Sequence, residues 1–147
     1  MGTNMFHQTH WELEPQRAGL GLAVLKPDRF VALRAGSEPA ELLTYGFKLP
    51  GNTVLLNATT ESNGWLRLEV LEASGKPIAG LSEADCIPIT GDSTAHAVHW
   101  KGADAGATIA GRAVRLRLRA QNAEVFSIYC SESNGLPPYY RFSAARP

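Results

Sequence analysis

The chain has 147 residues, the length of one domain with its own hydrophobic core. Lys and Arg together number 14, as do Asp and Glu, so the formal net charge is zero, which argues against a nucleic-acid-binding protein. Two cysteines are too few for a disulfide scaffold, and no apolar run approaches the ~18 residues of a transmembrane helix. We therefore expect neither nucleic acid nor membrane as a partner.

The N-terminal segment, residues 1–18, is polar and without periodicity, and is interpreted as an arm or the tail of a preceding unit. As written, it lacks the apolar core of a secretion signal, so the localisation stays open between the cytoplasm and excision from a larger protein. Short extended segments follow at 20–25, 30–33, 42–48, 53–59, 65–72, 87–89, 95–100, 112–119 and 125–130. The predicted domain covers residues 19–131. Residues 132–147 form an extension that packs on it or is loose.

Turn residues separate these segments. Pro27-Asp28, Asn63-Gly64 and Ser74-Gly75 are turn signals, and Asn-Gly is among the strongest dipeptides for a hairpin because both residues tolerate a positive φ. In the segment 65–72, which follows Asn63-Gly64, apolar and polar side chains alternate. The pattern predicts a hairpin whose second strand directs Leu66, Leu68 and Val70 to the core.

The sharpest alternation lies in residues 112–119, where Val114, Leu116 and Leu118 are interleaved with three arginines. The next segment has Phe126, Ile128 and Cys130 in phase. Directly opposed residues in an antiparallel pair share a face, so Leu118 is expected opposite Phe126, with residues 121–123 as the loop. The same register predicts Arg115 opposite Tyr129.

The fold predicted from these segments is all-β, an antiparallel two-sheet β-sandwich of jelly-roll-like type. No internal repeat is present.

Several stretches resemble the C-terminal β-sandwich of bacterial glycoside-hydrolase-like proteins of the family 32/43 type, in which this domain follows a β-propeller. They are residues 17–23 leading into 28–33, then 68–71 with 75–78, 85–86, 91–93, 100–102, and the Arg-Leu alternation that leads to Phe126-Ser127. The resemblance implies a sandwich similar to carbohydrate-binding modules, attached to a sugar-active propeller. No catalytic motif lies in the matching stretch, so none of the propeller's acidic catalytic residues is assigned here.

Aromatic rings next to polar side chains are the pattern expected of a sugar site, because the C–H face of a sugar packs on a ring while its hydroxyls need polar partners. The candidate carbohydrate-binding residues are Trp65, Arg67, Glu69, Trp100, Arg115 and Tyr129. The alternative is that the aromatic rings cover sheet edges or a domain interface. The arginines at 115, 117 and 119 are open to two interpretations, attraction of an acidic polysaccharide or a solvated face paired with Glu69 or Glu124.

No cofactor is predicted, although a structural calcium held by Asp85, Asp92 and Asp104 stays open because Ca²⁺ accepts oxygen ligands in loose geometry. Cys86 and Cys130 pair only if the protein is exported; Cys130 otherwise fits a small core side chain.

The predicted function is that of a non-catalytic, carbohydrate-binding-type accessory domain that binds a polysaccharide or oligosaccharide weakly. The alternative is a structural or interaction domain without a sugar site, which packs on a propeller catalytic domain, another partner protein or a second copy of itself. Independent enzymatic activity requires two carboxylates in one cleft, and no spacing in the sequence places two on facing strands.

Overall fold

A computed structural model of the chain describes residues 21–51, 53–102 and 109–131. The strands are β1 Leu33–Ala35, β2 Ala40–Leu43, β3 Phe47–Lys48, β4 Thr53–Glu72, β5 Asp92–Ala97 and β6 Ala113–Ser131. Every strand pairing is antiparallel, which confirms the all-β, antiparallel prediction. The predicted arm (1–18) and extension (132–147) lie outside the described residues. Within the described ranges, no helix has both the length and the hydrophobicity needed to cross a membrane.

Two long strands form the centre of the sheet. β4 has 20 residues and β6 has 19, and they pair from Thr53 opposite Ser131 to Glu72 opposite Val114. The strand order is β1-β6-β4-β5, and β2 and β3 also pair with β6. All the strands therefore belong to one hydrogen-bonded sheet.

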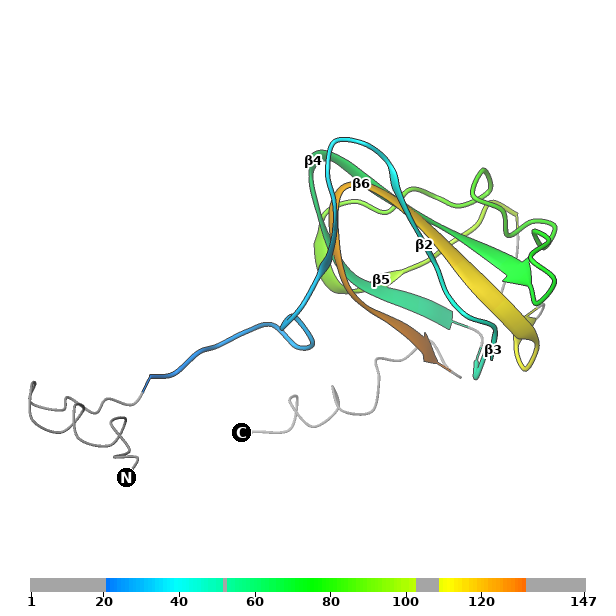
Figure 1. The fold of residues 1–147 in the computed structure, drawn as a ribbon, viewed down its shortest axis with the longest axis horizontal. Coiled ribbons are helices and arrows are strands. Elements are labelled where there is room, and N and C mark those ends of the chain that lie inside the picture. The colour runs from blue at the N-terminus through cyan, green and yellow to red at the C-terminus, as the bar shows by residue number, and fades with distance from the viewer. Residues whose placement is uncertain (1–20, 52, 103–108, 132–147) are drawn as a thin grey trace, which may run out of the picture.

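The sheet folds over at a corner in both long strands. Figure 1 shows β4 and β6 running along one side of the molecule, bending together at the top and continuing down the other side. We call β4 residues 53–60, β6 residues 123–131 and β5 the first arm. The second arm is β4 residues 65–72, β6 residues 113–121, β2 and β3.

The corner has an identifiable physical cause. Asn122 has a φ of 45°, and the register passes from Thr60 opposite Ala123 to Trp65 opposite Gln121. A Cβ atom on Gly64 would lie 2.2 Å from the backbone oxygen of Asn122. The two backbones approach so closely that only glycine fits at this position.

Two local predictions are wrong at this corner. Asn63-Gly64 does not reverse the chain, and residues 121–123 are not a hairpin loop, since β4 and β6 both continue through these positions. The conformational freedom that suits a hairpin turn serves here to bend a continuous pair of strands. Consequently Leu118 lies opposite Leu68 rather than Phe126, and Arg115 lies opposite Leu71 rather than Tyr129.

The hydrophobic core gathers the inward side chains of both arms. The residues predicted to face inward on the second arm are almost fully buried, which confirms the alternation there: Leu66, Leu68, Val70, Val114, Leu116 and Leu118. On the first arm, Ala123 and Val125 belong to the core, and Ile128 and Cys130 pack against it. The prediction for Phe126 is wrong, because a register shift between Asn57 and Ala58 leaves Phe126 without a partner in the β4 register and outside this core.

The connections contribute further core residues. Ile78, Leu81 and Cys86 from the loop 73–91 are buried, and so is Trp100. The segment predicted at 87–89 forms only an isolated bridge between Ile89 and Leu66. The described part of the segment 20–25 is exposed and outside any strand. Turns at Pro27-Asp28 and Ser74-Gly75 are present as predicted.

Candidate functional site

The candidate site is an open groove on the outer face of the second arm, the face that points away from the core. Trp65 and Arg67 of β4 and Arg119 of β6 contribute strand side chains, and Arg67 lies directly opposite Arg119 in the register. The other lining residues come from beside the strands: Pro39 precedes β2, while Glu83 and Pro88 belong to the loop 73–91. The groove encloses about 490 Å³, which lies within the range of ~300–1,000 Å³ usual for small-molecule sites.

The Trp65 ring is held in place but remains partly exposed. Its indole N–H donates to Oε1 of Gln121 at 2.8 Å. The Cζ atom of Arg67 lies 5.7 Å from the ring centroid, close to the outer limit of about 6 Å for a cation–π contact. Trp65 is therefore an oriented apolar ring, and the guanidinium group of Arg67 makes a weak contact with it.

Glu69 is one of two polar residues that are buried within the described ranges, and its side chain is only 5% exposed. Arg117 donates to Glu69 Oε2 through Nε at 2.6 Å and also through Nη2. The hydrogen bond to Glu69 raises the pKa of Arg117. Arg119 likewise donates to Glu83, at 3.1 Å. Of the three arginines interpreted as paired with Glu69 or Glu124, Arg117 alone pairs with Glu69, and Glu124 lies near Arg34 of β1 instead.

The remaining predicted sugar-binding residues do not meet at the groove. Trp100 is buried in the core, where its indole N–H donates to the backbone oxygen of Leu68 at 3.0 Å. Arg115 donates through Nε to the backbone oxygen of Thr44 at 3.1 Å. Tyr129 lies on the first arm. The structure thus brings together Trp65 and Arg67 and places Glu69 as a buried counterion beside them.

Of the other lining residues, Arg119 was identified in the sequence as a possible contact for an acidic polysaccharide, whereas Pro39, Glu83 and Pro88 were not proposed as binding residues. Arg119 belongs to the alternating row of arginines, which predicts an outward side chain. The predicted hairpin register, with Leu118 opposite Phe126, set Val125 opposite Arg119 instead of Arg67. The other three come from connections, which carry no periodicity that would place them.

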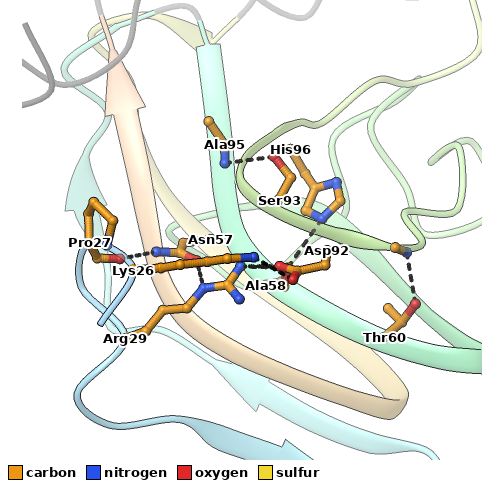
Figure 2. Close-up of polar contacts among 11 residues, drawn as sticks. Lys26, Pro27, Arg29, Asn57, Ala58, Thr60, Asp92, Ser93, Ala95 and His96 are labelled. Carbon is orange, nitrogen blue, oxygen red and sulfur yellow. Dashed lines mark hydrogen bonds and ion pairs between the residues drawn. The ribbon is translucent and has the colours of Figure 1, made fainter. Parts of the chain in front are cut away.

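The outer face of the first arm is covered by a segment that we call the clamp, residues 26–29. Figure 2 shows its contacts with the sheet. Arg29 donates through Nε to Oδ1 of the fully buried Asn57 at 2.9 Å, and the Nδ2 of Asn57 donates to the backbone oxygen of Pro27 at 2.8 Å. The Cζ of Arg29 also lies 4.6 Å from the centroid of Phe126. Both polar atoms of the Asn57 side chain therefore have a hydrogen-bond partner in the clamp.

Asp92 of β5 fixes the clamp by two ion pairs. Lys26 Nζ lies 2.6 Å from Asp92 Oδ2, and Arg29 Nη2 lies 2.5 Å from Oδ1. The hydrogen bond from Lys26, followed by that from Arg29, lowers the pKa of Asp92 from 3.8 to about 2. Asp92 is thus a structural anion in the clamp.

Two of the calcium candidates, Asp85 and Asp92, are separated in function and place. Asp85 accepts from the Ser82 hydroxyl at 2.6 Å within its own turn, Asp92 holds the clamp, and Asp104 lies outside the described residues. Among the described residues, no group of three or more His, Cys, Asp or Glu side chains is placed to hold a metal ion.

Cys86 and Cys130 are both free thiols. Burial raises the pKa of each, so both are poor nucleophiles near neutral pH. In addition, the Sγ of Cys86 accepts from the backbone N–H of Leu68 at 3.3 Å, as expected of a core side chain.

Comparison with known proteins adds no assignment: no protein-family model, no curated protein and no solved structure matches this chain.

Proposed function

We propose that the folded sheet is a jelly-roll-like β-sandwich whose two layers are the two arms of the same long strands. The supporting observation is that inward side chains from both arms belong to one core, including Leu56 and Val125 of the first arm and Leu68 and Leu116 of the second.

We propose further that the chain is a non-catalytic, carbohydrate-binding-type accessory domain of a glycoside-hydrolase-like protein. The observation that carries this proposal is the partly exposed, hydrogen-bonded Trp65 ring in a groove with Arg67 and Arg119. An apolar sugar face stacks on the indole while the guanidinium groups donate to sugar oxygens. Because the hydrogen bond to Gln121 orients the Trp65 ring, binding needs reorganisation of little more than the Arg67 side chain, which lies over the ring.

The groove suits binding better than glycoside hydrolysis. Hydrolysis uses two carboxyl groups about 5–10 Å apart on either side of the scissile bond. Among the described residues that line the groove, Glu83 is the single carboxylate, and it accepts from Arg119. A groove with one aromatic ring and a few donors predicts weak binding, with a Kd of about 10⁻³ to 10⁻⁵ M, since hydroxyl desolvation offsets much of the contact energy.

A panel of soluble polysaccharides in affinity electrophoresis tests this function. We expect at least one polysaccharide to retard the wild type, and Trp65→Ala to weaken that binding about tenfold or more, because one aromatic contact contributes on the order of 1.4 kcal/mol. Trp65→Phe retains an aromatic face and is expected to bind at an intermediate level. Tyr45→Ala is the control, because Tyr45 is aromatic and 94% exposed but lies outside the groove. If no polysaccharide retards the wild type, the sugar-binding function is wrong.

A second candidate function is supported by the distribution of exposed apolar side chains. Among the described residues, eight of the nine large exposed hydrophobic side chains lie between positions 22 and 45: Leu22, Val24, Leu25, Phe30, Val31, Leu33, Leu43 and Tyr45. Phe30 is 81% exposed and Val31 76%. A stretch of chain with this many exposed apolar side chains favours contact with another protein. The second candidate is therefore an interaction domain that packs on a partner protein or a second copy of itself.

Light scattering coupled to gel filtration tests whether the domain packs on a second copy of itself. A dimer that Phe30→Ser and Val31→Ser together convert to a monomer supports it. A wild type that stays monomeric over the accessible concentration range excludes self-association through this surface.

A further inference from the structure

The groove contains two like charges placed directly opposite each other. Arg67 and Arg119 are partners in the β4–β6 register, on the same outer face of the sheet. Directly opposed like charges destabilise an antiparallel pair, and an anion that sits between or beside the two groups relieves this repulsion.

One of the two arginines already has its anion. Glu83 accepts from Nη1 of Arg119 at 3.1 and 3.4 Å. The neighbouring Arg117 is likewise paired with Glu69. Arg67 differs, because within the described part of the chain no carboxylate lies within ion-pair distance of it.

The lining of the groove therefore carries an excess positive charge at one defined place. Its charged members are Arg67, Arg119 and Glu83, two positive and one negative. Glu41 lies opposite Arg119 on the other neighbouring strand, β2, and does not line the groove. The uncompensated guanidinium is that of Arg67, and it lies over the Trp65 ring.

We propose that the groove selects a carboxylated sugar, a uronic acid residue of an acidic glycan. The carboxylate pairs with Arg67 while the C–H face of the same sugar stacks on Trp65. A guanidinium group matches a carboxylate through two parallel hydrogen bonds, a geometry that a neutral hydroxymethyl group cannot reproduce. This inference rests on the proposed sugar-binding function and specifies its ligand.

Two matched probes isolate the charge: trigalacturonic acid and its fully methyl-esterified form, which share the sugar rings and differ in the carboxylates. In isothermal titration calorimetry, we expect the wild type to bind the acid about tenfold more tightly than the ester, because a hydrogen bond to a charged group contributes about 1.5 kcal/mol or more. Arg67→Gln is expected to weaken binding of the acid about tenfold more than binding of the ester, so that the preference for the acid disappears.

Arg34→Gln is the control for general electrostatic attraction. Arg34 lies on β1, is 70% exposed and is not among the groove residues. Its loss is expected to leave the preference for the acid intact. Raising the salt concentration should weaken acid binding by wild type and Arg34→Gln alike, and weaken ester binding little.

The outcomes separate this inference from the function on which it rests. Equal binding of both probes, each lost in Trp65→Ala, overturns the acidic specificity and leaves the sugar-binding function standing. Acid binding that Arg34→Gln weakens as much as Arg67→Gln also overturns it, because the attraction then belongs to the whole surface. If neither these probes nor any polysaccharide of the panel binds, both proposals are wrong.

Discussion

On the first arm, the outer face of the sheet is closed by residues 26–29, which bury Asn57 completely and engage Asp92 through two ion pairs. On the second arm, part of the outer face of the same two strands stays open, where Trp65 and Arg67 line a groove, while Glu69 on the same face is buried. Both faces carry arginines, aromatic rings and carboxylates. The two faces differ in how far a neighbouring segment of the chain covers them and binds their polar side chains. A similar composition can therefore yield a structural contact on one arm and a binding surface on the other.

The largest effect is expected from breaking the corner that separates the arms. Gly64→Ala places a methyl group 2.2 Å from the Asn122 backbone oxygen, and neither backbone can move without disturbing the pairing of both arms. We expect a loss of about 3 kcal/mol in the free energy of unfolding, measured by urea denaturation, because overpacking against backbone costs roughly 1–3 kcal/mol or more.

Gly36→Ala is the matched control for this substitution, since a Cβ there meets nothing within 4 Å. Its free energy of unfolding should stay within about 0.5 kcal/mol of the wild type, as is usual for surface substitutions. Equal stability of the two variants would contradict the close approach at the corner.

The next effect concerns the ion pairs of the second arm. Glu69→Gln removes a carboxylate whose side chain is 5% exposed and leaves Arg117 without its counterion. We expect a loss of about 1–2 kcal/mol in unfolding free energy, less than for a fully buried pair because Arg117 is 33% exposed. Glu83→Gln, at the more exposed pair with Arg119, should cost under about 1 kcal/mol. The reverse ranking in urea denaturation would show that Glu69 is not a buried counterion.

A smaller and local effect is expected on the first arm. Asp92→Asn weakens the ion pairs to Lys26 and Arg29, so the clamp should open more often while the sheet stays folded. Trypsin should cut after Arg29 several-fold faster in this variant than in the wild type, with Glu41→Gln as a control outside the clamp. An unchanged cleavage rate would mean that Asn57 and Phe126 hold the clamp without Asp92.

The smallest effect is the pH dependence of the same contact. Because the pKa of Asp92 is lowered from 3.8 to about 2, its ionised form stabilises the folded clamp. This stabilisation is fully present above the unfolded pKa of 3.8 and is lost as the pH falls through about 2. The difference in melting temperature between wild type and Asp92→Asn should therefore be constant near neutral pH and shrink across this acid range. A difference that persists unchanged at the acid end would contradict the assignment.

The sequence predicted the strands of the second arm well, because Leu66, Leu68 and Val70 are buried as their alternation indicates, although Glu69 and Leu71 are buried as well. It failed at the corner, because Asn63, Gly64 and Asn122 have the same conformational freedom in a hairpin turn as in a bend. A strand signal cannot show which partner it pairs with, so the opposition of Arg67 and Arg119 could not be deduced.

The candidate site could likewise be predicted only in part from the sequence. Trp65 and Arg67 were identified because they fall on the polar phase of a regular strand. Trp100 was expected at the surface because it ends the predicted segment 95–100. In the structure, its hydrogen bond to the backbone of Leu68 holds it in the core. The clamp was missed because its contacts join positions far apart in the chain, such as Arg29 and Asp92, and no local pattern records them.

The contrast between an open and a closed arm is tested most directly by mapping backbone amide and indole chemical shifts during a titration with trigalacturonic acid. We predict that the perturbed signals come from the second arm, led by the Trp65 indole N–H and the amides of Arg67 and Arg119, while those of Arg29 and Asn57 stay unchanged. Shifts concentrated at the clamp, or spread evenly over both arms, would contradict the assignment of the groove as the binding surface.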